Sequence, residues 1–178
     1  MTPRVAIDAG RFRRLMTGVC APVTIVTAMH NNLPHGATVS SFASLSLDPP
    51  LISIAFQRTA MMLQRVHETG RFGVNLLGQA QEDLARLFAQ PGADRFANTA
   101  WRIDTGLPRL DSAAGWVVCE LYREVDAGDH VLLFGLVTDA STSDLPPLVY
   151  AHRTFGTHSG FNRRPRPPIV DQIAACSY

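Results

Sequence analysis

The chain has 178 residues, of which 46% are apolar and 17% charged, and its formal net charge is +1. This balance is typical of one folded domain with a substantial core, and it gives no electrostatic basis for binding nucleic acid or an anionic membrane. All sixteen basic residues are arginine, which excludes a Schiff-base lysine and the lysine of a phosphate-binding loop.

The three cysteines, Cys20, Cys119 and Cys176, have no CxxC spacing. This pattern indicates neither a disulfide framework nor a zinc site. Cys20 and Cys119 lie in apolar runs and are predicted to be small core residues, and Cys176 is predicted to be a free thiol. The sequence shows no signal-peptide core and no apolar run near the roughly 18 residues of a membrane span, so we expect a cytoplasmic protein.

The first half of the chain is predicted to contain a helix, three strands and a second helix. The first helix is expected over residues 8–19, with one apolar face made by Phe12, Leu15, Met16 and Val19. Alternating β-branched residues predict a strand over residues 22–29, and a turn at residues 30–35 leads into a hydroxyl-rich strand. A strand over residues 51–56 and a helix over residues 59–68, ended by Gly70, follow.

The second half is predicted to be mostly strands. We expect a strand at residues 72–77, a helix at 79–89, a loop at 91–100 and a hairpin at 101–110. Two longer strands, at residues 116–125 and 130–140, are joined by a turn at residues 127–129, and a last strand is expected at 148–155. Short antiparallel strands with two or three helices predict a mainly β fold, a small barrel with flanking helices.

Residues 36–50 form the most informative segment, because it places five hydroxyl side chains within nine residues, at Thr38, Ser40, Ser41, Ser44 and Ser46. Each hydroxyl in a buried strand needs a hydrogen bond or loses free energy. Either a polar ligand lies along this strand, or it is a half-exposed edge strand. Alternation places Thr38 and Ser40 on one face and Val39 and Ser41 on the other.

This segment resembles the flavin-contacting strand of the flavin reductase-like family, the small reductase components of two-component flavin monooxygenases. Residues 71–77, 128–130, 147–150 and 153–156 match other family stretches in the same order. The resemblance implies a flavin reductase-like domain over residues 1–161, followed by a Pro/Arg-rich tail over residues 162–178. It also implies a split β-barrel of the FMN-binding type and a homodimer, which agrees with the apolar composition.

The resemblance implies the activity of an NAD(P)H:flavin oxidoreductase that transfers hydride from NADH or NADPH to N5 of FMN or FAD. Reduced flavin then reaches a partner monooxygenase, by diffusion. Two alternatives remain open: a flavin-binding module without turnover, and an enzyme similar to pyridoxamine-phosphate oxidase on a similar barrel. The absence of lysine argues against the latter, which needs several cationic phosphate contacts. The sequence contains no Gly-x-Ser-x-Gly elbow and no glycine-rich dinucleotide fingerprint.

The flavin-binding residues that the resemblance implies begin with five on the hydroxyl-rich strand, Ala37, Thr38, Val39, Ser40 and Ser41. Arg58 and Thr59 match the family's phosphate-binding region, although Ala60 and the two methionines that follow depart from its pattern. Thr59 also opens a predicted helix, where free N–H groups suit an anion. Residue types alone leave an alternative open, in which Thr59 is a helix cap and Arg58 a surface arginine.

Three further residues come from the second half of the chain. The family places the histidine of the Gly-Asp-His turn beside the nicotinamide, so His130 is the predicted catalytic residue. Arg153 is expected to face a dinucleotide phosphate and Phe155 to shape the ring pocket. Residue types alone leave an alternative open for each. His130 is then a hydrogen-bonded residue at a strand edge, Arg153 a solvated arginine and Phe155 a core residue. No metal site is predicted, because His30 and His35 lack an acid or cysteine to complete a ligand set.

Overall fold

The computed structural model describes residues 7–158, so the predicted tail at residues 162–178 lies outside the described part. The fold is mainly β with three helices in this part, as predicted. The helices are α1 (Ala9–Thr17), α2 (Met61–Thr69) and α3 (Glu82–Ala89). The strands are β1 (Ala21–Pro22), β2 (Thr24–His30), β3 (Leu33–Val39), β4 (Ala43–Leu47), β5 (Pro50–Gln57), β6 (Arg71–Leu76), β7 (Trp101–Asp104), β8 (Leu107–Leu110), β9 (Gly115–Ala127), β10 (His130–Thr142), β11 (Val149–Ala151) and β12 (Thr154–Gly156).

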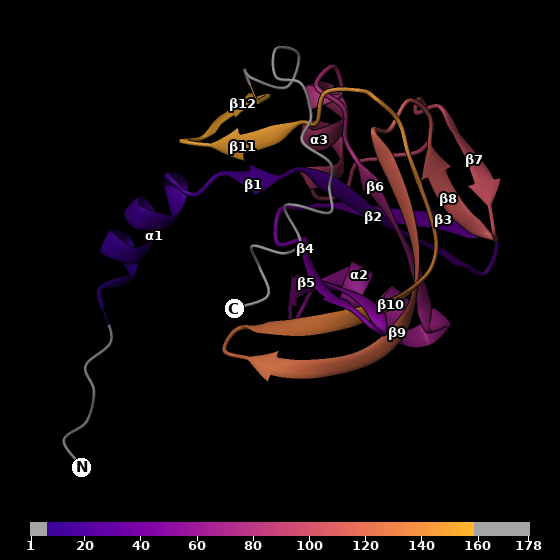
Figure 1. Cartoon of the computed structure of the whole chain (residues 1–178), viewed down its shortest axis with the longest axis horizontal. Helices are drawn as coiled ribbons and strands as arrows, with labels where there is room; N and C mark the ends of the chain where they lie inside the picture. The colour runs from indigo at the N-terminus through magenta and orange to yellow at the C-terminus, as the bar shows by residue number, and fades with distance from the viewer. Residues whose placement is uncertain (1–6, 159–178) are drawn as a thin grey trace.

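Seven strands form one antiparallel sheet in the order β3-β2-β6-β9-β10-β5-β4. Its edge strands β3 and β4 follow each other along the chain but do not pair with one another, so the sheet is not closed. A small sheet, β1-β11-β12, and the β7-β8 hairpin accompany it. The long β9-β10 hairpin curves along one side of the molecule, and α1 lies apart from the sheet (Figure 1).

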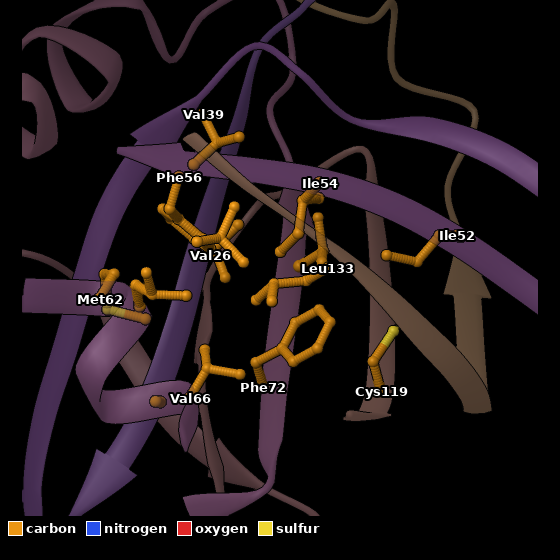
Figure 2. Close-up of a cluster of buried hydrophobic side chains, with 14 residues drawn as sticks. Val26, Val39, Ile52, Ile54, Phe56, Met62, Val66, Phe72, Cys119 and Leu133 are labelled. Atoms are coloured by element: carbon orange, nitrogen blue, oxygen red, sulfur yellow. The ribbon is translucent and has the colours of Figure 1, made fainter. Parts of the chain in front are cut away.

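The main core lies inside the curve of this sheet. Val39 from β3, Ile54 from β5 and Phe72 from β6 belong to one buried cluster, although β3 is an edge strand, β5 lies next to the opposite edge and β6 lies between them. Their side chains point toward one another, with Met62 and Val66 of α2 beside them (Figure 2). The apolar alternation of the strands therefore curls the sheet around a common interior.

The sequence predicted that the hydroxyl-rich segment is one continuous strand, but the structure divides it into two strands. β3 ends at Val39, residues 40–42 form a connection, and β4 begins at Ala43 at the other edge of the sheet. The preceding turn is also shorter than predicted, because Asn31 and Asn32 alone reverse the chain with φ of 51° and 60°. Asparagine tolerates this left-handed conformation, which suits a two-residue hairpin.

Two other predicted elements differ from the structure. The last strand is a hairpin of β11 and β12, because His152 and Arg153 adopt φ of 50° and 62° and reverse the chain. The second helix begins at Met61 with Ala60 as its N-cap, so Thr59 lies outside it. The helix therefore begins two residues later than predicted, and the alternative interpretation of Thr59 as its cap is wrong.

The apolar face of α1 is exposed. Phe12, Leu15 and Met16 of this helix, and Val19 just beyond its end, are between 44% and 65% exposed, and no residue of the helix is buried. Cys119 lies in the core as predicted, but Cys20 is exposed because it follows α1 outside the sheet. No helix within residues 7–158 has the length and apolar character to cross a membrane.

Candidate functional site

A cavity of about 310 Å³ lies where the end of β3 meets β5 and the start of β10. We call it the histidine cavity. It brings together six of the predicted site residues, Ala37, Thr38, Val39, Ser40, Ser41 and His130. The other lining residues are Ala55, Phe56, Gln57 and Ala60.

Strand pairing explains this arrangement. Gln57 at the end of β5 pairs with His130 at the start of β10, which places the histidine beside the β5 end. The Ser41 hydroxyl donates to the carbonyl of Ala55 at 3.1 Å and accepts the Ala55 N–H at 2.8 Å. These two bonds hold the segment after β3 against β5, across the open side of the sheet.

The three hydroxyls of the predicted flavin strand have different surroundings. Thr38 donates to the carbonyl of Ala85 in α3 at 2.7 Å, and Ser41 is bonded to Ala55. Ser40 is exposed, and its hydroxyl makes no hydrogen bond within residues 7–158. Ser40 is therefore the hydroxyl that remains available to a ligand.

A second cavity, of about 470 Å³, adjoins the first and shares Thr38 and Ser40 with it. We call it the arginine cavity. It contains the predicted residues Arg153 and Phe155, and its remaining lining residues are Val23, Ala85, Arg86, Ala89, Gln90 and Tyr150. Arg86, Gln90 and Tyr150 were not predicted as site residues, because their positions in the sequence indicate only a helix and a strand.

Arginine and aromatic side chains determine the character of this second cavity. The Arg86 guanidinium carbon lies 5.0 Å from the Phe155 ring centroid, and the same side chain pairs with Glu82 at 2.6 Å. The Tyr150 and Phe155 rings are 4.9 Å apart. Arg153, on the turn between β11 and β12, has no ion pair with any residue that the structure describes. The cavity thus combines aromatic surface with a cation available to an anion.

His130 is held by its neighbour in the turn. Its Nδ1 lies 2.7 Å from a carboxylate oxygen of Asp129, and this hydrogen bond is the main cause that lowers the pKa of Asp129. The Gly128-Asp129 turn was predicted, and Gly128 has the positive φ of 65° that such a tight turn requires. An ionised Asp129 favours a proton on Nδ1, which leaves Nε2 as the ring nitrogen without a protein partner in the described part.

The two predicted phosphate-binding residues line neither cavity. Arg58 binds the β9-β10 turn: its Nη1 pairs with Asp126 at 2.7 Å, and its Nε donates to the carbonyl of Gly128 at 2.9 Å. Thr59 is exposed on the connection between β5 and α2. The structure therefore brings eight of the ten predicted residues to two adjoining cavities and leaves these two outside.

The paired cavities suit a flavin. A flavin has a flat ring edged with carbonyl and N–H groups, a hydroxylated chain and a phosphate. The hydroxyl of Ser40, the backbone of residues 37–41, the aromatic rings and Arg153 have the hydrogen-bonding, stacking and charge properties that match these parts. The two cavities thus combine polar, aromatic and cationic groups, and His130 lines one of them.

The fold and this site agree with the family to which the sequence belongs. Residues 16–159 match the family model described as "Flavin reductase like domain", which covers most of the chain. The protein is therefore a member of the flavin reductase-like domain family, as the sequence resemblance predicted.

Two of the named relatives are reductases. The chain is 38% identical over 157 residues to a "Probable flavin reductase" of Rhizobium meliloti, covering 87% of this chain. It spans only about half of that relative, 49%. It is 33% identical to the reductase component of a 4-nitrophenol 4-monooxygenase/4-nitrocatechol 2-monooxygenase of Rhodococcus opacus, covering 84% of this chain and 81% of the relative.

A solved structure shares the fold. The NADH:FAD oxidoreductase SgcE6 of Streptomyces globisporus, in complex with NAD and FAD fragments, superposes with a TM-score of 0.80 at 29% identity. The match covers 93% of this chain and 99% of that one.

Proposed function

We propose that this protein is an NAD(P)H:flavin oxidoreductase that supplies reduced flavin to a partner monooxygenase. The observation that carries this proposal is the pair of adjoining cavities, which share Thr38 and Ser40 while one contains His130 and the other Arg153 and Phe155. Two ligands that must touch each other need adjoining sites of this kind. The flavin accepts hydride at N5, and this chemistry belongs to the cofactor.

The protein's residues bind and orient the two reactants. We assign Ser40 and the backbone of residues 37–41 to the flavin, and His130 to the edge of the nicotinamide. Arg153 is the cation for a dinucleotide phosphate, and Phe155 provides apolar ring surface, with Arg86 stacked on it. No general acid is required, because hydride passes directly between the two ring systems.

We propose the cofactors of this chain by comparison with relatives. The NADH:FAD activity in the name of SgcE6 supports FAD and NADH for this chain, with FMN and NADPH as the other members of each pair to be compared. The reductase component of Rhodococcus opacus supports a flavin-dependent monooxygenase as the recipient of reduced flavin. We propose that reduced flavin reaches that partner by diffusion, in the cytoplasm.

The remaining structural features of the family are part of the same proposal. They are a split barrel of the FMN-binding type, a domain that ends at residue 161, a tail over residues 162–178 and a homodimer. The Ser41–Ala55 bonds, which join the end of β3 to β5, support a split barrel. The exposed apolar face of α1 supports the dimer, because such surface is usually covered.

Steady-state kinetics test the activity. NADH and NADPH oxidation is measured with FMN, FAD and riboflavin in turn, with a control that lacks protein. We expect protein-dependent oxidation that requires added flavin. Flavin binding without turnover for either nucleotide would instead identify a non-catalytic flavin-binding module.

A further inference from the structure

Arg58 makes three contacts with the turn that carries His130. Its Nη1 pairs with Asp126 at 2.7 Å, and its Nε donates to the Gly128 carbonyl at 2.9 Å. Its own backbone N–H donates to the Asp129 carbonyl at 3.2 Å. One residue at the end of β5 thus binds three of the four residues that lead from β9 into His130.

These contacts compete with a phosphate-binding role. Asp126 already pairs with the Arg58 guanidinium, and the Nε–H bond to Gly128 orients the guanidinium plane toward the turn. Arg58 also lies outside the lining of both cavities. An anion at Arg58 would have to share the guanidinium with Asp126, whose negative charge repels it.

The turn passes this constraint on to the histidine. The Asp129 carbonyl is bound by the Arg58 N–H, and the Asp129 carboxylate is bound to Nδ1 of His130. The Asp129 side chain is 91% exposed, so surrounding packing does not hold it in place. Its direction depends on the backbone of the turn, which Arg58 fixes from the side of β5.

We propose that Arg58 is a positioning residue for His130 and not a phosphate ligand. The guanidinium holds the turn, the turn holds Asp129, and Asp129 orients the imidazole at the wall of the histidine cavity. This inference rests on the proposed function for the role of His130 in the reaction. It assigns Arg58 to the nicotinamide side of the chemistry, in contrast to the phosphate role that the sequence predicted.

Two variants separate these roles. Arg58→Ala removes both contacts that the guanidinium makes with the turn, to Asp126 and to the Gly128 carbonyl. Asp126→Asn weakens the ion pair while the arginine charge remains. The positioning role predicts that both raise the apparent KM for NADH, or slow flavin reduction, by about threefold to tenfold. Titrations with FMN and with riboflavin, which lacks the phosphate, should both stay within about twofold of wild type.

A matched control removes a comparable exposed ion pair elsewhere. Asp111 pairs with Arg102 beside the β7-β8 hairpin, and neither residue lines the two cavities. Asp111→Asn should leave the kinetics and the flavin titrations unchanged. The melting temperature is measured for all three variants, and rates are compared per folded molecule.

Two results overturn the proposal. Weaker FMN binding in Arg58→Ala, with riboflavin binding unchanged, would identify a phosphate ligand. Kinetics that remain wild-type in both Arg58→Ala and Asp126→Asn would show that the contacts do not position His130.

A spectroscopic measurement keeps this inference separate from the proposed function. Nitrogen NMR of the His130 ring, assigned with a His130→Gln variant, reports its tautomer without any turnover. Wild-type protein should show the proton on Nδ1, and both turn variants should shift toward a mixture of tautomers. An unchanged tautomer in both variants contradicts the positioning role, and a changed tautomer supports it. Both conclusions hold even if the wild-type protein has no reductase activity.

Discussion

The hydroxyl of Ser41 makes two hydrogen bonds with the backbone of Ala55, donating to its carbonyl at 3.1 Å and accepting its N–H at 2.8 Å. These bonds join the end of β3 to β5, whereas Ser40, one residue earlier, has no such partner in the described part of the chain. Two adjacent serines of the same predicted motif therefore have different surroundings: the Ser41 hydroxyl is bonded to β5, and Ser40 lines both cavities.

This difference predicts that two single substitutions affect different properties, flavin binding in one case and stability in the other. Ser40→Ala should weaken flavin binding by about threefold to tenfold, because one hydrogen bond is worth roughly 0.5–1.5 kcal/mol, and leave the melting temperature without flavin unchanged. Ser41→Ala should lower the free energy of unfolding by about 1 kcal/mol and change flavin affinity less. Fluorescence titration and thermal unfolding of both variants check this. A Ser40→Ala variant with wild-type flavin affinity contradicts it.

His130→Ala should affect the nucleotide and not the flavin. We expect a higher apparent KM for NADH or slower hydride transfer, with flavin affinity close to wild type. A contact made equally in the ground and transition states appears in KM, and one made only in the transition state appears in kcat. Stopped-flow reduction of the flavin-loaded variant measures both. If only the melting temperature falls, His130 is a residue that stabilises the turn.

Local signals in the sequence predicted a large part of this fold. β-Branched residues indicate β2, which lies between β3 and β6, and Gly128 indicates a tight turn because it adopts a positive φ. The partner of Arg58 was not predictable, because Asp126 lies 68 positions away in the sequence. Only the pairing of β5 with β10 brings that turn to Arg58.

The candidate site also depends on contacts between distant parts of the sequence, which local signals do not reveal. Alternation correctly separates Thr38 and Ser40 from Val39, since Thr38 and Ser40 line the arginine cavity and Val39 does not. It does not reveal which hydroxyl a neighbouring strand occupies, so Ser40 and Ser41 were predicted to act alike. Arg86 was missed because the arginine cavity forms between α3 and β12, which are far apart in the sequence.

The two described cysteines should react very differently with thiol reagents. Burial raises the pKa of Cys119 to about 12, so its thiolate is scarce at neutral pH, whereas Cys20 is exposed. Labelling with iodoacetamide followed by peptide mass spectrometry should modify Cys20 in the folded protein and Cys119 only after denaturation. Cys20→Ser is the control. Rapid labelling of Cys119 in folded protein contradicts the buried position.

The protein is expected to be a homodimer in solution. The apolar face of α1 and other exposed apolar side chains, such as Leu47 at 70% exposure, suit contact with a second copy. Light scattering at micromolar concentration should give twice the chain mass of 19.4 kDa. A monomer mass would rule out the dimer, and a Leu15→Glu variant that turns monomeric would place α1 in the interface.

The central claim is that these cavities bring a nicotinamide and a flavin together for hydride transfer. Anaerobic stopped-flow mixing of the flavin-loaded protein with NADH, and with NADH deuterated at the transferred position, tests it most directly. We predict loss of the oxidised flavin absorbance in proportion to the NADH consumed, in a phase that deuterium slows. Tight flavin binding with no reduction by NADH or NADPH above the protein-free control would contradict the account.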